Sequence, residues 1–108
     1  MTTGAYWNVS NPLKPWGYFD PNAVLDIPFD WATWLADIGG THASHTITAD
    51  TPLRSTASSE AAGVITVRIE AAVAGVFVIG QKYPVTCHIV TADGQEEDQT
   101  VFLKIMEK

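Results

Sequence analysis

The sequence predicts an all-β protein, an immunoglobulin-like β-sandwich of about seven strands with an extended N-terminal arm. Apolar and polar residues alternate with a two-residue period in several short segments, and turn-forming residues separate these segments. One such segment places Tyr83, Val85, Cys87 and Ile89 on the same face. The second-to-last strand of such a sandwich often opens with a Tyr whose phenol bonds back to the backbone, and we expect this of Tyr83.

Size and composition place the chain among single-domain globular proteins. Its 108 residues suit one domain, and 46% apolar against 17% charged residues exclude a disordered chain or a coiled coil. The net charge of −6 argues against a nucleic-acid partner, because phosphate binding needs a basic surface. No apolar run is long enough to span a membrane, and the first residues lack the pattern of a secretory signal. Cys87 is the sole cysteine, so we expect no internal disulfide.

We divide the chain into an extended aromatic arm, residues 1–22, and a sandwich domain, residues 23–108. Prolines and glycines recur in the arm and argue against regular structure there. A disordered linker is poor in aromatic residues, whereas this segment is rich in them. The arm either folds back over its own domain or docks on a neighbouring subunit, since Trp and Tyr are preferred interface anchors. The candidate interface residues are Tyr6, Trp7, Trp16, Tyr18 and Phe19.

The sandwich is expected to begin with a strand over residues 24–31, where apolar and polar residues alternate. Pro28 lacks an N–H donor, which restricts this strand to a sheet edge or to its outward-bonding side. The period then changes, and the spacing of the apolar residues predicts one helical turn over residues 31–37. This turn is expected to cap one end of the sandwich, with Trp34 and Leu35 pointing inward.

Three strands, a loop and an apolar run are expected before Tyr83. Alternation predicts a strand over residues 42–51, a weaker strand over 53–58 and a strong strand over 64–71. Small residues at 58–63 predict a loop between the last two. The apolar run at 75–80 lies between glycines and is either a short strand or a corner.

The C-terminal third reads as a strand over 83–91, a turn at 92–94 and a last alternating strand that ends near Ile105. An acidic stretch follows the turn. It is either a solvated hairpin tip that prevents edge pairing or a contact for a basic patch on a partner. This second candidate interface consists of Glu96, Glu97 and Asp98.

The inward positions of these segments define the expected hydrophobic core, because alternate residues of a strand point to the same face. The expected core residues are Leu25, Phe29, Trp31, Trp34, Leu35, Ile47, Ile65, Val67, Ile69, Tyr83, Val85, Cys87, Ile89, Val101, Leu103 and Ile105.

Histidine and cysteine residues raise the question of a metal or catalytic site. His42 and His45 are three residues apart, and His88 follows Cys87. Neighbouring residues on a strand point to opposite faces, so Cys87 and His88 are poorly placed to share a metal. Cys87 falls on the apolar face of a predicted core strand, which disfavours a nucleophile. We therefore expect no catalytic residue, no metal site and no cofactor.

Several aspartates bracket the tryptophans and bring a glycosidase or a calcium site to mind. Asp26 and Asp30 share one strand face, but at the usual rise they lie about 13 Å apart, which is too far for a catalytic pair. Capping of turns or a solvated strand face is the preferred interpretation.

Two blocks of the sequence resemble a family of small tailed-bacteriophage virion proteins, the fiber–tail adaptor proteins. The first block, from Asp20 to Asp37, is similar to a family opening that runs Asp-Pro-x-x-Val-Leu-Asp-Tyr and then Asp-Trp-x-x-Trp-Leu. The second, from Tyr83 through Gly94 to Asp98, is similar to the second half of the family. The sequence departs from the pattern at Ile27, in the apolar residues 75–80 and in its longer arm.

The resemblance implies a non-enzymatic structural protein of the virion, which joins fibers or other appendages to the tail or portal region. It implies other virion proteins as partners, several symmetric copies in the particle, and assembly in the host cytoplasm. One alternative is a capsid decoration (cement) protein. A second alternative is a carbohydrate-binding module, for which exposed tryptophans would supply the binding platform.

Overall fold

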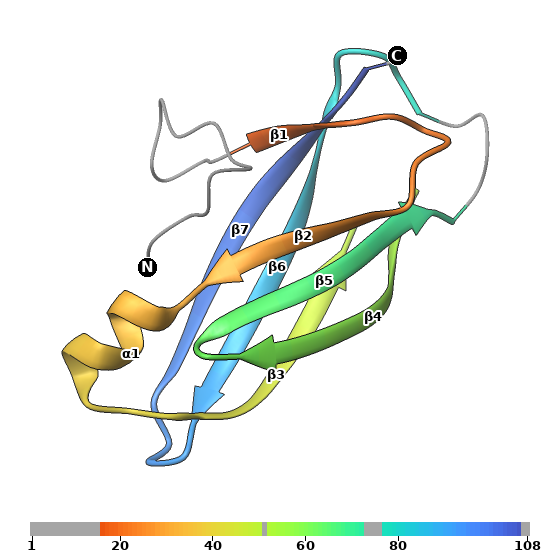
Figure 1. Ribbon diagram of the computed structural model, residues 1–108. Coiled ribbons are helices and arrows are strands. Elements are labelled where there is room, and N and C mark those ends of the chain that lie inside the picture. Colours follow the sequence, from red (N-terminus) through yellow and green to blue (C-terminus); the bar gives the residue numbers. More distant parts are fainter. Residues whose placement is uncertain (1–15, 51, 73–76, 107–108) are drawn as a thin grey trace.

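The computed structural model describes residues 16–50, 52–72 and 77–106 (Figure 1). Within them it holds seven strands in two sheets, with order β1-β7-β6-β3 in one sheet and β2-β5-β4 in the other. The predicted all-β sandwich is therefore confirmed. The elements are β1 (Trp16–Phe19), β2 (Leu25–Asp30), α1 (Ala32–Ile38), β3 (His42–Ala49), β4 (Leu53–Ala61), β5 (Val64–Ala71), β6 (Lys82–Thr91) and β7 (Glu96–Ile105).

The core lies between the two sheets, where alternate residues of the strands meet. Most of the expected core residues are buried there. Leu25, Trp34, Ile47 and Tyr83 are only partly buried and pack against the rim of the core. Three core residues were not predicted, namely Phe19, Ile27 and Leu53.

The segment from β2 to α1 follows the prediction closely. Pro28 lies on β2, which is an edge strand of its sheet, so its missing N–H interrupts no ladder on the free side. Trp31 is fully buried, and its ring lies 5.3 Å from that of Trp34 in an edge-to-face contact. Gly39 ends the helix in a left-handed conformation, as is usual for a helix C-terminus.

The prediction of a loop at residues 58–63 is wrong. β4 continues to Ala61, and a two-residue turn of Ala62 and Gly63, both with positive φ, leads into β5. A Cβ on Gly63 would lie 2.9 Å from the Cα of Ala32, so the turn packs tightly against the start of α1. The small residues that suggested a loop are instead the exposed positions of a paired strand.

The prediction that residues 1–22 lack regular structure is wrong for Trp16–Phe19. These residues form β1, which pairs in parallel with β7, with Trp16 opposite Phe102 and Phe19 opposite Ile105. The Phe19 side chain is fully buried. This buried side chain anchors the short strand to the core. A strand of only four residues is too short to show a clear alternating pattern in the sequence. Tyr6 and Trp7 lie outside the described residues.

The apolar run before β6 is a corner in its described part, residues 77–80, and not a strand. Phe77 packs between Phe19 and Tyr83, with ring centroids 6.2 and 5.5 Å away. The Val78 backbone N–H donates a hydrogen bond of 3.3 Å to the Tyr83 hydroxyl. The expected bond between this phenol and the backbone is thus present, and it fastens the corner to the first residues of β6.

Candidate docking surfaces

The exposed residues of greatest interest lie at the two ends of the four-stranded sheet. β1 and the C-terminal end of β7 lie at one end of the molecule, and the β6–β7 hairpin lies at the other (Figure 1). The molecule measures 43 Å along its longest axis, so the two ends are well separated. We call Tyr18, Val78, Ile79 and Met106 the apolar tip, and Glu96, Glu97 and Asp98 the acidic end.

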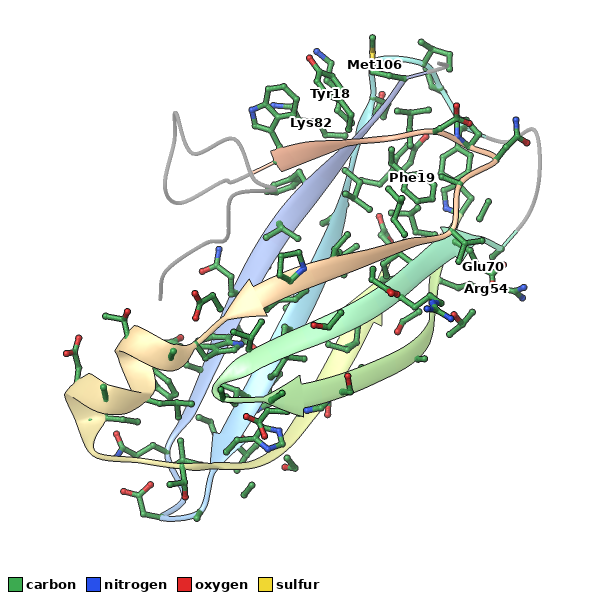
Figure 2. All side chains as sticks on the ribbon, in the orientation of Figure 1. Tyr18, Phe19, Arg54, Glu70, Lys82 and Met106 are labelled. Atoms are coloured by element: carbon green, nitrogen blue, oxygen red, sulfur yellow. The ribbon has the colours of Figure 1, made fainter. Side chains whose placement is uncertain are left out.

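The apolar tip gathers most of the large exposed hydrophobic residues of the described chain. Val78 is 59% exposed, Ile79 55%, Tyr18 46% and Met106 36%. The Gly80 N–H donates to the Ile105 carbonyl at 2.8 Å, which brings the corner at Val78 and Ile79 beside the end of β7. Figure 2 shows Tyr18 and Met106 at this end of the molecule. Clustered exposed hydrophobic residues commonly mark interaction sites.

Two lysines lie next to the apolar tip and share one aromatic ring. Lys82 and Lys104 are opposite each other on β6 and β7. The Lys82 Nζ lies 4.9 Å, and the Lys104 Nζ 5.5 Å, from the ring centroid of Trp16. The Trp16 ring also meets Tyr18 edge to face at 5.0 Å. The indole face holds two ammonium groups by cation–π attraction and positions them on the outer face of the sheet.

The acidic residues do not form a hairpin tip, because all three belong to β7 and pair with β6. The His88 ring lies between two of them, with Nε2 2.8 Å from Glu96 Oε1 and Nδ1 2.6 Å from Asp98 Oδ1. The hydrogen bonds to Glu96 and then Asp98 raise the pKa of His88. Even a charged imidazolium neutralises only part of this end, because one positive charge faces the two carboxylates of Glu96 and Asp98. The acidic end therefore keeps a negative surface.

Thr91 positions the acidic end, although sequence reasoning gave it no role. Its side chain is almost fully buried, and its hydroxyl donates to an Asp93 carboxylate oxygen. The Thr91 Oγ1 atom in turn accepts the Gln95 N–H at 2.9 Å, and Gly94 takes positive φ. The hydrogen bond from Thr91 also lowers the pKa of Asp93. A threonine directly before an Ala-Asp-Gly turn was the available signal.

The histidines of β3 bind to each other and to β4, which belongs to the opposite sheet. His42 Nε2 lies 2.8 Å from His45 Nδ1, and His45 Nε2 lies 2.9 Å from Ser58 Oγ. Glu60 Oε1 lies 3.8 Å from His42 Nδ1. Burial, and then the neighbouring His42, lower the pKa of His45. The arrangement joins the two sheets along one open edge, and no group of three metal-ligating side chains occurs among the described residues.

The remaining candidates have structural roles. Burial raises the pKa of the Cys87 thiol to about 11, which suppresses the reactive thiolate. Asp30 accepts the Ala32 N–H at 3.0 Å at the start of α1, and Asp20 accepts the Asn22 N–H at 2.9 Å. Asp26 forms a two-bond ion pair with Arg68 across β2 and β5, at 2.9 and 3.1 Å. The prediction of turn capping and a solvated strand face is confirmed for these aspartates.

The described part of the chain contains no helix long and apolar enough to cross a membrane. Residues 20–104 match the family described as podophage GP4 fiber-tail adaptor protein gp77. The match begins directly after β1 and ends one residue before the end of β7. No curated protein matches the sequence.

Proposed function

Because the chain belongs to the podophage GP4 fiber-tail adaptor family, we propose that it is a bacteriophage virion component that attaches fibers or other appendages at the tail or portal. The role is structural and involves other virion proteins in several symmetric copies. The observation that supports it most directly is the apolar tip. A folded domain that exposes a cluster of large hydrophobic side chains at one end has a surface suited to a protein partner.

The apolar tip supplies the chemistry of an anchoring contact. Large hydrophobic and aromatic side chains contribute most of the free energy of protein contacts when a partner buries them. Residues 1–15 precede β1, which begins at this end, so we propose that Tyr6 and Trp7 extend the same contact. Trp16 and the acidic end contact neighbouring subunits. Phe19 is removed from the candidate interface, because the core buries it completely.

Neither alternative role is supported. Trp31 is fully buried and Trp34 is half-buried, so these tryptophans offer no exposed platform for a sugar. The family matched over residues 20–104 is an adaptor family, and this match gives no support to capsid decoration.

The test is incorporation of tip variants into particles that lack the wild-type chain. The change Val78→Ser/Ile79→Ser removes apolar surface without touching the buried core, and we expect at least a tenfold drop in copies per particle. Quantitative mass spectrometry of purified particles measures the copies, and electron microscopy counts the fibers. Val24→Ser is a matched control, since Val24 is 57% exposed but precedes β2 and lies outside the tip. Normal incorporation and full fiber numbers with the tip variant would contradict the proposal.

A further inference from the structure

The outer face of the four-stranded sheet carries opposite charges at its two ends. Register fixes which residues share this face: Lys82 lies opposite Lys104 near one end, and His88 lies opposite Asp98 near the other. Along β7, Asp98 and Lys104 are six positions apart, which corresponds to about 20 Å. Both residues therefore point to the same side of one strand.

The two lysines differ from the other described cations in their partners. Arg54 pairs with Glu70 at 3.4 Å, and Arg68 pairs with Asp26 at 2.9 Å, both on the opposite sheet. Among the described residues, Lys82 and Lys104 enter no ion pair and contact the Trp16 ring instead. The chain has a net charge of −6, yet these two cations have no carboxylate partner within it among the described residues. This indicates a site where carboxylates of another molecule pair with them.

The surface between the two ends is uncharged and suited to close contact. Thr86 and Thr100 bridge β6 and β7 with a hydroxyl pair of 2.8 Å. Pro84 and Phe102 lie opposite each other beside them, and both are partly buried. This central strip has no charge whose desolvation would oppose contact with another flat surface.

We propose that this outer face binds a second copy of the chain, with its lysine end over the acidic end of the partner copy. A face with one positive and one negative end is complementary to its own copy after a two-fold rotation, so both charged contacts form at once. The distance between the two charged ends is the same in both copies, because the copies are identical. Lys104 of each copy can therefore reach Asp98 of the other at the same time. Val78 and Ile79 of the apolar tip lie on the corner before β6 and not on this face, so they remain available for a different virion protein.

The size of the face sets the expected strength. β1, β7, β6 and β3 hold 4, 10, 10 and 8 residues, which at about 3.4 Å per residue and about 4.8 Å between strands give roughly 500 Å² per copy. Stable complexes bury about 800 Å² per partner. We therefore expect a weak, reversible dimer that forms at ~100 µM and weakens with salt, since charge attraction is screened beyond about 10 Å at 0.1 M.

The test uses charge reversal and mixing of the purified full-length chain, measured by sedimentation velocity over a range of concentrations. Lys82→Glu/Lys104→Glu and Glu96→Lys/Asp98→Lys should each weaken dimerisation at least tenfold. An equimolar mixture of the two variants should restore it, because each variant supplies the charge that the other lost.

Arg54→Glu/Arg68→Glu changes the net charge equally on the other sheet and should leave the dimer intact. Lys82→Gln/Lys104→Gln and Glu96→Gln/Asp98→Asn give a milder pair if a reversal variant does not fold.

Three results would overturn the proposal: a wild-type chain that stays monomeric, variants that dimerise like wild type, or a mixture that stays monomeric. A dimer that appears only after deletion of residues 1–15 would instead assign the face to that segment of the same chain. The inference rests on the proposed adaptor role only in requiring several copies. Because its readout is self-association in solution, its failure is distinguishable from a failure of tip variants to enter particles.

Discussion

At the scale of single residues, two histidines change the stability of the fold with pH in opposite directions. His45 lies at the open edge between the sheets, where burial and His42 disfavour its charged form. His88 lies between two carboxylates that favour its charged form. Both have an ordinary pKa of 6.5, so both contributions change near the same pH and oppose each other.

We predict that single substitutions separate these contributions to the free energy of unfolding. The lowered pKa of His45 gives stability that is present above 6.5 and lost as the pH falls through the native pKa. The raised pKa of His88 gives stability that is present below 6.5 and lost as the pH rises through the native pKa. His88→Gln should therefore become more stable with rising pH, and His45→Gln less stable. Urea unfolding at several pH values between about 5.5 and 8 measures the slopes, and equal slopes in the two variants would contradict the assignment.

At the scale of elements, two glycine turns look alike in backbone conformation but differ in their surroundings. Gly63 connects β4 to β5 with a φ of 83°, and Gly94 lies between β6 and β7 with a φ of 89°. A Cβ at Gly63 would meet the backbone of α1, whereas a Cβ at Gly94 meets nothing within 4 Å. The Gly63 carbonyl also accepts the Trp31 N–H at 2.8 Å, which joins the turn to the start of the helix.

Substitution by alanine should separate the conformational from the steric cost. Gly94→Ala is expected to cost about 1–2 kcal/mol, the usual penalty for a left-handed side chain. Gly63→Ala pays the same penalty and must also push α1 aside, so we expect a loss of at least about 3 kcal/mol in total. Chemical denaturation of both variants gives the comparison. Similar losses of stability in the two variants would show that α1 moves aside without a loss of stability.

At the scale of the whole molecule, the last residues of the expected arm form a strand of the four-stranded sheet. The family match begins at residue 20, and the arm was expected to include residues 1–22. β1 nevertheless completes the four-stranded sheet, and Phe19 fills the core between the sheets. The Phe19 carbonyl also accepts the Met106 N–H at 3.0 Å. We therefore propose that the folded unit includes β1.

Truncation tests this boundary. Deletion of residues 1–15 should leave the melting temperature close to that of the full chain. Deletion of residues 1–19 removes β1 and the Phe19 side chain and should cost at least about 3–5 kcal/mol, the range for loss of a buried Phe. Phe19→Ala in the full chain should cause most of the same loss. Thermal melting by circular dichroism measures all three, and equal stability of the two truncations would place β1 outside the folded unit.

The alternating pattern of the sequence by itself determined the sandwich, most of its core and the edge position of Pro28, because strand periodicity and turn chemistry are local. The resemblance carried by Asp20–Asp37 gave the family. Only the tertiary structure decided that Phe19 is core and that Val78 and Met106 share an exposed tip. It also decided that Lys82 and Lys104 flank Trp16. The positions of Phe19 and Trp16 depend on the parallel pairing of β1 with β7, which joins residues more than eighty positions apart. The shared tip depends on the bond from the Gly80 N–H to the Ile105 carbonyl, and no local pattern encodes contacts of such long range.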